Sequence, residues 1–297
     1  MMSIGRLCEW AQVSRSGFYK YLARVKQPNN KELSDREDFE YILEAYNHRG
    51  YKKGSRSLFM RLMRNGHPMS RNKIRRLMNK YKLFCPIRKA NPYKQMAKAL
   101  DESTVAPNVL KRHFKDMGPR YVILTDITYL FYGNCRKCYV SVMKDAYTNE
   151  ILGYSVSSSM EEDFVLDTVK MCMSNHKHEI PQNALVHSDQ GIHYKAYSFK
   201  QLLHDCELRQ SMSRKANCWD NAPQESFFGH MKDEIDITSC NIFDDVKKII
   251  DDYIDYYNND RPQWDLAYLT PSEYYNYSIT GQYPINLKEL PSKKKSI

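Results

Sequence analysis

The spacing of apolar residues changes near residue 120, and this change limits the folds open to the chain. Before it, apolar residues recur at helical spacing, as in Phe39, Ile42, Leu43 and Tyr46, which predicts amphipathic helices. After it, the run RYVILTDITYLF is rich in β-branched and aromatic residues, which predicts a strand. The sequence therefore predicts a helical N-terminal part followed by a part built on a sheet.

Charge divides the chain at the same point. Residues 1–120 hold 27 Lys and Arg against 10 Asp and Glu, whereas the remainder holds 18 against 25, within a net charge of +10. A basic part joined to an acidic part indicates that the first binds a polyanion and the second has different chemistry. Nucleic acid is the commonest such polyanion; an effect on solubility is the alternative.

Cysteine usage and hydropathy indicate a cytoplasmic protein with no membrane partner. There is no apolar run long enough to span a bilayer and no secretory signal pattern, and the eight cysteines fit a compartment in which thiols stay reduced. Cys135 and Cys138 form one C-x-x-C pair, but no second pair with zinc-site spacing follows. We interpret this stretch as a hairpin with its turn at Gly133–Asn134.

Serine residues mark the expected starts of the N-terminal helices. Two short helices are predicted in the first 25 residues, with Ser14 or Ser16 capping the second. Ser34 and Glu37 have the spacing of a capping box, and Ser70 is placed to cap a later helix that follows a Gly-containing turn. Helix pairs with a tight turn are compatible with helix-turn-helix DNA binding.

The helix that follows Ser70 carries cations on both sides of its apolar stripe, which suits insertion into a major groove of DNA. An ordinary solvated basic face is the alternative. Residues 82–119 are basic and have little periodicity apart from a possible short helix near 94–101. The candidate DNA-binding residues of the helix are Arg71, Lys73, Arg75, Arg76 and Lys80.

Beyond residue 119 the pattern predicts the order β-β-β-α-β-α-β-α, a mixed five-stranded sheet with helices packed on it, which is an α/β fold. Ser159 and Glu162 have capping-box spacing at the start of the first of these helices. Asn221 is the expected cap of the last one, and Pro223 is tolerated in its first turn.

Three carboxylates occupy positions where the local pattern favours an apolar or neutral residue. Asp126 lies within a strand, Asp189 follows a short buried strand, and Glu225 lies on the later helix, two turns before Lys232. Ends of strands in α/β sheets are common ligand sites. Neighbouring carboxylates repel one another, and Mg²⁺, which prefers oxygen ligands, would resolve this. Each acid could instead be a cap, a turn residue or a surface charge.

Six stretches of the sequence carry a family resemblance: TDITYL, HSDQG, SMSRKANCWDNAPQESFFGHMKDE, YIDYYNNDRPQWDLAYLTPSEY, SRSGFYKYL near the N-terminus, and the helix-turn-helix stretch that begins HRGYKKGSRSL. They resemble the transposases of the insertion-sequence-three family, of the type encoded in the second reading frame. The resemblance covers nearly the whole chain, except the tail after about residue 280. The 35 residues between Asp189 and Glu225 match the spacing of that family's motif.

The resemblance implies a ribonuclease-H-like integrase core. Asp126, Asp189 and Glu225 are then the catalytic acids, which bind two Mg²⁺ ions or Mn²⁺ as a substitute. The implied partners are double-stranded DNA, both as terminal inverted repeats and as target, further copies of the chain on that DNA, and an upstream-frame product, because the family's active enzyme is usually a fusion. The residues implied to contact DNA near the acids are Lys232, Arg214, Lys215 and Asn217.

The expected domains are an N-terminal helix-turn-helix-like segment at 1–30, a helix-turn-helix DNA-binding domain at 31–84, a basic linker at 85–118, a catalytic core at 119–235 and a C-terminal helical extension at 236–297. A DNA transposase is the favoured function. A non-catalytic DNA-binding regulator from a truncated transposase, or a nuclease of the same fold without strand transfer, are the alternatives.

Overall fold

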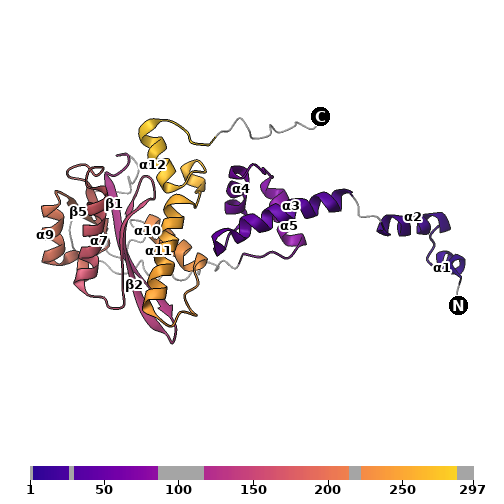
Figure 1. Ribbon diagram of the computed structural model, residues 1–297, viewed down its shortest axis with the longest axis horizontal. Coiled ribbons are helices and arrows are strands. Elements are labelled where there is room, and N and C mark those ends of the chain that lie inside the picture. The colour runs from indigo at the N-terminus through magenta and orange to yellow at the C-terminus, as the bar shows by residue number, and fades with distance from the viewer. Residues whose placement is uncertain (1–2, 27–29, 86–116, 214–221, 286–297) are drawn as a thin grey trace.

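The computed structural model describes residues 3–26, 30–85, 117–213 and 222–285. The N-terminal part is helical, and the remainder is a sheet covered by helices (Figure 1). The change in apolar spacing near residue 120 therefore marks a change of architecture, as predicted. None of the described helices is long and apolar enough to cross a membrane.

Two short helices, α1 (Ile4–Trp10) and α2 (Arg15–Lys26), confirm the prediction for the N-terminus. The Ser14 hydroxyl accepts a hydrogen bond of 3.0 Å from the Gly17 backbone N–H. This bond satisfies one of the N–H groups that a helix start leaves without a partner. Ser14 is therefore the capping residue, and Ser16 lies inside the helix.

The next three helices, α3 (Asn30–Asn47), α4 (Ser55–Arg64) and α5 (Arg71–Lys80), pack around a small core, with a single 3-10 turn at His48–Gly50. The predicted cap of α5 is confirmed, because the Ser70 hydroxyl accepts a hydrogen bond from the third residue of the helix. The core residues with no exposed surface are Ile42, Leu58, Ile74 and Leu77.

Both predicted capping boxes are wrong. α3 already begins at Asn30, so Ser34 lies inside the helix, where its hydroxyl donates to Asp38 at 3.4 Å. The extra turn includes Glu32, whose carboxylate contacts α5, and this tertiary contact favours the longer helix. The later helix α7 has no side-chain hydrogen bond at its N-terminus, so Ser159 is not its cap.

The five strands found in the described residues form one sheet in the order β3-β2-β1-β4-β5. The first three strands form an antiparallel meander, whereas β4 and β5 run parallel to β1. This arrangement confirms the predicted mixed sheet. The strands are β1 (Val122–Tyr132), β2 (Arg136–Asp145), β3 (Ile151–Ser157), β4 (Leu185–Ser188) and β5 (Arg209–Met212).

Helices cover both faces of the sheet: α7 and α9 lie on one side, and α10 and α11 on the other (Figure 1). The predicted element order is confirmed, with one additional short helix, α8, between β4 and α9. The helices and turns are α7 (Glu162–His176), α8 (Ile192–Lys195), α9 (Tyr197–Asp205), α10 (Ala222–Glu234), α11 (Phe243–Asn259), the 3-10 turn Trp264–Leu266 and α12 (Pro271–Thr280).

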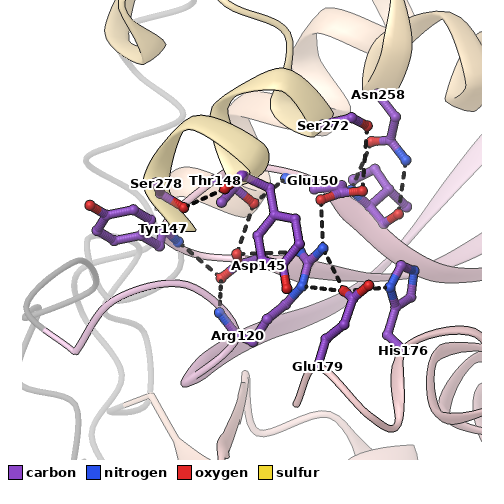
Figure 2. Close-up of polar contacts among 12 residues, drawn as sticks. Arg120, Asp145, Tyr147, Thr148, Glu150, His176, Glu179, Asn258, Ser272 and Ser278 are labelled. Atoms are coloured by element: carbon purple, nitrogen blue, oxygen red, sulfur yellow. Dashed lines mark hydrogen bonds and ion pairs between the residues drawn. The ribbon is translucent and has the colours of Figure 1, made fainter. Parts of the chain in front are cut away.

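A polar network centred on Arg120 connects the residues that precede β1 with the β2–β3 turn and with α12 (Figure 2). Arg120 is 1% exposed, and its guanidinium group donates to Glu150 at 2.7 Å and to Glu179 at 3.0 Å. Asp145 lies 3.5 Å away, and the ring centroid of Tyr275 lies 3.9 Å from the guanidinium carbon. This network holds the β2–β3 turn and α12 in place beside the start of β1.

The helical region also contacts the last two long helices. Arg61 of α4 donates a hydrogen bond of 2.8 Å to the carboxylate of Asp260, the residue that follows α11. Arg64 binds both carboxylate oxygens of Glu273 on α12, at 2.8 and 2.5 Å. The N-terminal helices are therefore joined to the sheet-bearing part by charged contacts.

Candidate active site

Asp126 lies in the middle of β1 and is half-buried. Strand alternation directs its side chain to the same face as Leu130 and Tyr132, which belong to the core beneath α10 and α11. One carboxylate oxygen accepts a hydrogen bond of 2.8 Å from the Ile127 N–H. The side chain is thereby held against its own strand, on the face that α10 covers.

Asp189 follows the last residue of β4 and is also half-buried. One of its carboxylate oxygens accepts a hydrogen bond of 2.8 Å from the Gly191 N–H. A Cβ atom at position 191 would lie only 3.0 Å from that oxygen, so glycine is what allows this close approach. The short turn thus orients Asp189 at the carboxyl end of a parallel strand, where ligands of α/β sheets bind.

The pairing of β1 with β4 brings the two aspartates together. The parallel register ends with Leu124 opposite His187, and two residues further along each strand stand Asp126 and Asp189. Burial raises the pKa of the Tyr194 hydroxyl well above its usual value, and the charges of both aspartates add to that rise. The two carboxylates therefore act on the same buried side chain.

The third predicted acid, Glu225, lies in the first turn of α10, and its side chain is outside the described part. α10 packs Phe227, Phe228 and Met231 against the sheet face that Asp126 shares. The helix that carries Glu225 thus covers the face of the sheet on which Asp126 lies. Among the described side chains, no three His, Cys, Asp or Glu form a metal-binding group.

Lys232, two turns after Glu225, lies over β1. Its ammonium nitrogen is 5.4 Å from the centroid of the Tyr129 ring. The sequence predicted a DNA contact for Lys232 but gave no signal that a β1 aromatic ring would be its neighbour. The predicted loop contacts Arg214, Lys215 and Asn217 lie outside the described residues.

The cations of α5 are largely engaged within the protein. Arg76 binds both oxygens of Asp35, at 2.6 and 2.8 Å, and Lys80 donates to the same carboxylate at 2.9 Å. Lys73 pairs with Asp38. Hydrogen bonds from Arg76 and then Lys80 hold the pKa of Asp35 well below its usual value. These acids of α3 reduce the positive charge that α5 presents.

The remaining two α5 candidates differ from each other. Arg75 is exposed and forms no ion pair with any described residue. Arg71 is half-buried, with its guanidinium carbon 6.0 Å from the Trp264 ring centroid. Of the five predicted contacts, Arg75 is therefore the one most available to a phosphate.

The histidines beside Asp189 have packing partners. His187 is fully buried, and its Nδ1 lies 3.0 Å from the Ser211 hydroxyl oxygen on β5. The ring of His193 meets Phe164 edge-on at 6.5 Å. In the hairpin, Cys135 is exposed at the turn and Cys138 is buried, both as free thiols.

A mixed sheet of this strand order, with an acid on its central strand and helices on both faces, defines a ribonuclease-H-like integrase core, here preceded by a helical region. The sequence matches the family models described as integrase core domain, at residues 116–218 and 225–279, and HTH-like domain, at residues 32–91.

The chain is 33% identical over 278 residues to the putative transposase InsK for insertion sequence element IS150 of Escherichia coli (strain K12), covering 92% of this chain and 93% of that protein. It is 29% identical over 233 residues to the transposase InsF for insertion sequence IS3A of the same organism, covering 78% and 79%. The chain belongs to the integrase-core transposases of the insertion-sequence-three family. This confirms the resemblance noted in the sequence.

Among solved structures, the HTLV-2 integrase catalytic core domain in complex with magnesium matches with a TM-score of 0.40 and 13% identity, over 53% of this chain and 97% of that one.

Proposed function

We propose that Asp126, Asp189 and Glu225 are the catalytic acids of a DDE transposase that cuts and joins DNA at the ends of an insertion sequence. The observation that supports this most is the β1–β4 register, in which the two aspartates follow the last paired residues of adjacent parallel strands. Their charges also converge on Tyr194. Acids fixed side by side on neighbouring strands form a preorganised ligand site.

The donor set fits Mg²⁺, with Mn²⁺ as a substitute, because carboxylate oxygens are the ligands that this ion prefers. Backbone N–H groups of Ile127 and Gly191 hold one oxygen of each aspartate, so little reorientation is needed on binding. Two ions held there would supply an activated water and stabilise charge on the leaving oxygen. Asp126, Asp189 and Glu225 would hold them.

The proposed reaction has two phosphoryl transfers. In the first, water attacks a phosphodiester at the element's end and the bond from phosphorus to the 3′-oxygen of the element's last nucleotide breaks. That oxygen takes up a proton and becomes a free 3′-hydroxyl, and the phosphate stays on the 5′ end of the flanking DNA. In the second, that hydroxyl attacks a phosphodiester of the target DNA, and the displaced oxygen leaves with the proton. Lys232 would bind a phosphate oxygen of the substrate strand next to the acids.

The N-terminal helices would bind the terminal inverted repeats, and the protein would act as a homo-oligomer on DNA, with the upstream-frame product as a possible fusion partner. In this proposal residues 1–30 and 31–84 bind DNA, residues 85–118 link them to the core at 119–235, and residues 236–297 extend it. The other proposed DNA contacts are Arg71, Lys73, Arg75, Arg76 and Lys80 on α5 and Arg214, Lys215 and Asn217.

The test is cleavage of a supercoiled plasmid that carries the flanking inverted repeats, in the presence of Mg²⁺ or Mn²⁺. Asp189→Asn should lose more in rate than the roughly 10- to 100-fold that loss of a hydrogen-bond partner of a metal ligand costs, while binding to the repeats stays intact. Asp205→Asn, which alters an exposed acid on α9, is the matched control and should cleave normally.

The two alternative functions give different results in the same assay. Binding without cleavage by the wild type, even with the upstream product added, would favour a DNA-binding regulator. Nicked plasmid without joined products would favour a nuclease. Equal cleavage by Asp189→Asn and wild type would contradict the assignment of the acids.

A further inference from the structure

β1 carries two exposed aromatic side chains beyond its acid. Tyr129 and Phe131 are each 49% exposed, and their rings lie 5.5 Å apart at 82°. Among the described residues, β1 pairs with β4 only as far as Leu124, so this end of the strand is paired with β2 alone. Exposed aromatic side chains grouped on a surface commonly mark a binding site.

Two lysines flank the same ring. Lys137 of β2 and Lys232 of α10 hold their ammonium nitrogens 5.6 and 5.4 Å from the Tyr129 ring centroid. Lys137 is exposed. Exposed rings combined with cations are the usual components of surfaces that bind single-stranded nucleic acid, where bases stack on the rings and lysines bind the backbone.

The position of Tyr129 relative to the acids indicates which ligand this aromatic and basic surface binds. Tyr129 is three residues after Asp126 on an extended strand, or about 10 Å along it. Side-chain alternation points its ring to the face opposite Asp126, but Lys232 of α10, the helix that covers the Asp126 face, lies 5.4 Å from the ring centroid, at a point where β1 pairs with no described residue of β4. A DNA strand bound by Lys232 next to the acids would therefore pass beside Tyr129. A protein partner fits less well, because an apolar side chain docked on the rings would also desolvate the neighbouring ammonium groups.

We propose that Tyr129, Phe131, Lys137 and Lys232 form a surface that binds unpaired bases of a DNA strand next to the acids, with a base stacked on Tyr129. The inference rests on the proposed function, because it assigns the bound strand to the substrate of the same site. A fully paired duplex hides its base faces. The surface should therefore favour DNA ends whose terminal pairs are opened.

The test is fluorescence anisotropy of the full chain with two labelled duplexes that carry the inverted repeat, one fully paired and one with its terminal pairs mismatched. EDTA is present, so no cleavage occurs. The wild type should bind the mismatched end more tightly. Tyr129→Ala should bind that end roughly tenfold more weakly, as expected for loss of one stacked base, and the paired end almost unchanged. Tyr129→Phe should retain the preference.

Tyr197→Ala on α9 is the matched control, because that tyrosine is 80% exposed and its hydroxyl donates to Gln201 of the same helix; it should bind both probes like the wild type. Lys137→Ala should weaken binding to both probes and reduce its salt dependence. Thermal unfolding would verify that each variant is folded.

The proposal is overturned if the wild type shows no preference for the mismatched end, or if Tyr129→Ala keeps that preference. Asp189→Asn separates this proposal from the catalytic one. If the acids act as proposed, this variant loses cleavage but keeps the binding preference. A wild type that prefers mismatched ends without ever cleaving would contradict only the catalytic assignment.

Discussion

At the scale of single residues, Arg120 is a buried cation that faces more negative charge than it carries. Asp145, Glu150 and Glu179 all lie within 3.5 Å of its guanidinium group, and Asp145 is fully buried. Burial would raise the pKa of Glu179, but the hydrogen bond from His176 and the charge of Arg120 outweigh it, so the pKa is lowered. His176 and Arg120 together therefore favour the ionised form of Glu179.

Arg120→Met should reduce the free energy of unfolding by about 3–5 kcal/mol, because it leaves buried carboxylates without their cation. Urea denaturation at neutral pH measures this loss. Lys170→Met is the control, since the Lys170–Asp167 pair is exposed and should contribute less than about 1 kcal/mol. A similar small loss for both variants would show that the network is not needed for stability.

At the scale of elements, α3 and α5 are joined by ion pairs that also limit what α5 can bind. Asp35→Asn should free Arg76, which now shares the Asp35 carboxylate with Lys80, whereas Lys80 keeps its contact with Glu32. If α5 contacts DNA, this variant should bind DNA more tightly and with a steeper salt dependence, because more cations meet phosphates. Glu37→Gln, which changes an exposed acid on the same helix, is the matched control.

The ion pairs of Asp35 should also make the stability of the helical region depend on pH in a defined direction. Because the pKa of Asp35 is lower in the folded state, the contribution of its carboxylate to stability is fully present above the pKa of the unfolded state, about 4. It is lost only as pH falls through the lower folded value. The melting temperature of Asp35→Asn should therefore lie below that of the wild type at neutral pH, with the gap closing only in strong acid. A gap that closes near pH 6 would contradict this assignment.

At the scale of the whole molecule, Asp260 joins the helical region to the sheet-bearing part. One oxygen of its carboxylate accepts a hydrogen bond of 2.8 Å from Arg61, and the other lies 2.5 Å from Nε2 of the His48 ring. Burial would raise the pKa of Asp260, but the hydrogen bonds from Arg61 and His48 lower it. The two parts are thus held together by an ionised carboxylate near neutral pH.

Asp260→Asn should destabilise the contact between the two parts by about 1.5–3 kcal/mol, the range for hydrogen bonds to charged groups. Calorimetry should show the helical region unfolding at a lower temperature while the sheet-bearing part is little changed. Asp255→Asn is the control, since Asp255 is more exposed and meets Arg49 only at 3.4 Å. Unchanged calorimetric traces for both variants would mean that this contact does not couple the two parts.

By itself, the sequence determined the elements and their order. Apolar spacing, the Gly133–Asn134 turn and the serine caps at Ser14 and Ser70 are local signals, and the predicted helices and strands follow them. The strand context of Asp126 and the strand-end position of Asp189 were local signals too. The Ser34 capping-box prediction was wrong because a contact with another helix, which local spacing does not contain, lengthened α3.

Only the tertiary structure decided what the elements bring together. Three arrangements join residues that are far apart in the chain. The β1–β4 register aligns the two aspartates, acids of α3 form ion pairs with cations of α5, and two lysines lie around Tyr129. Pairing of this kind depends on packing and on charge partners in space, and these energies are carried by no short stretch of sequence.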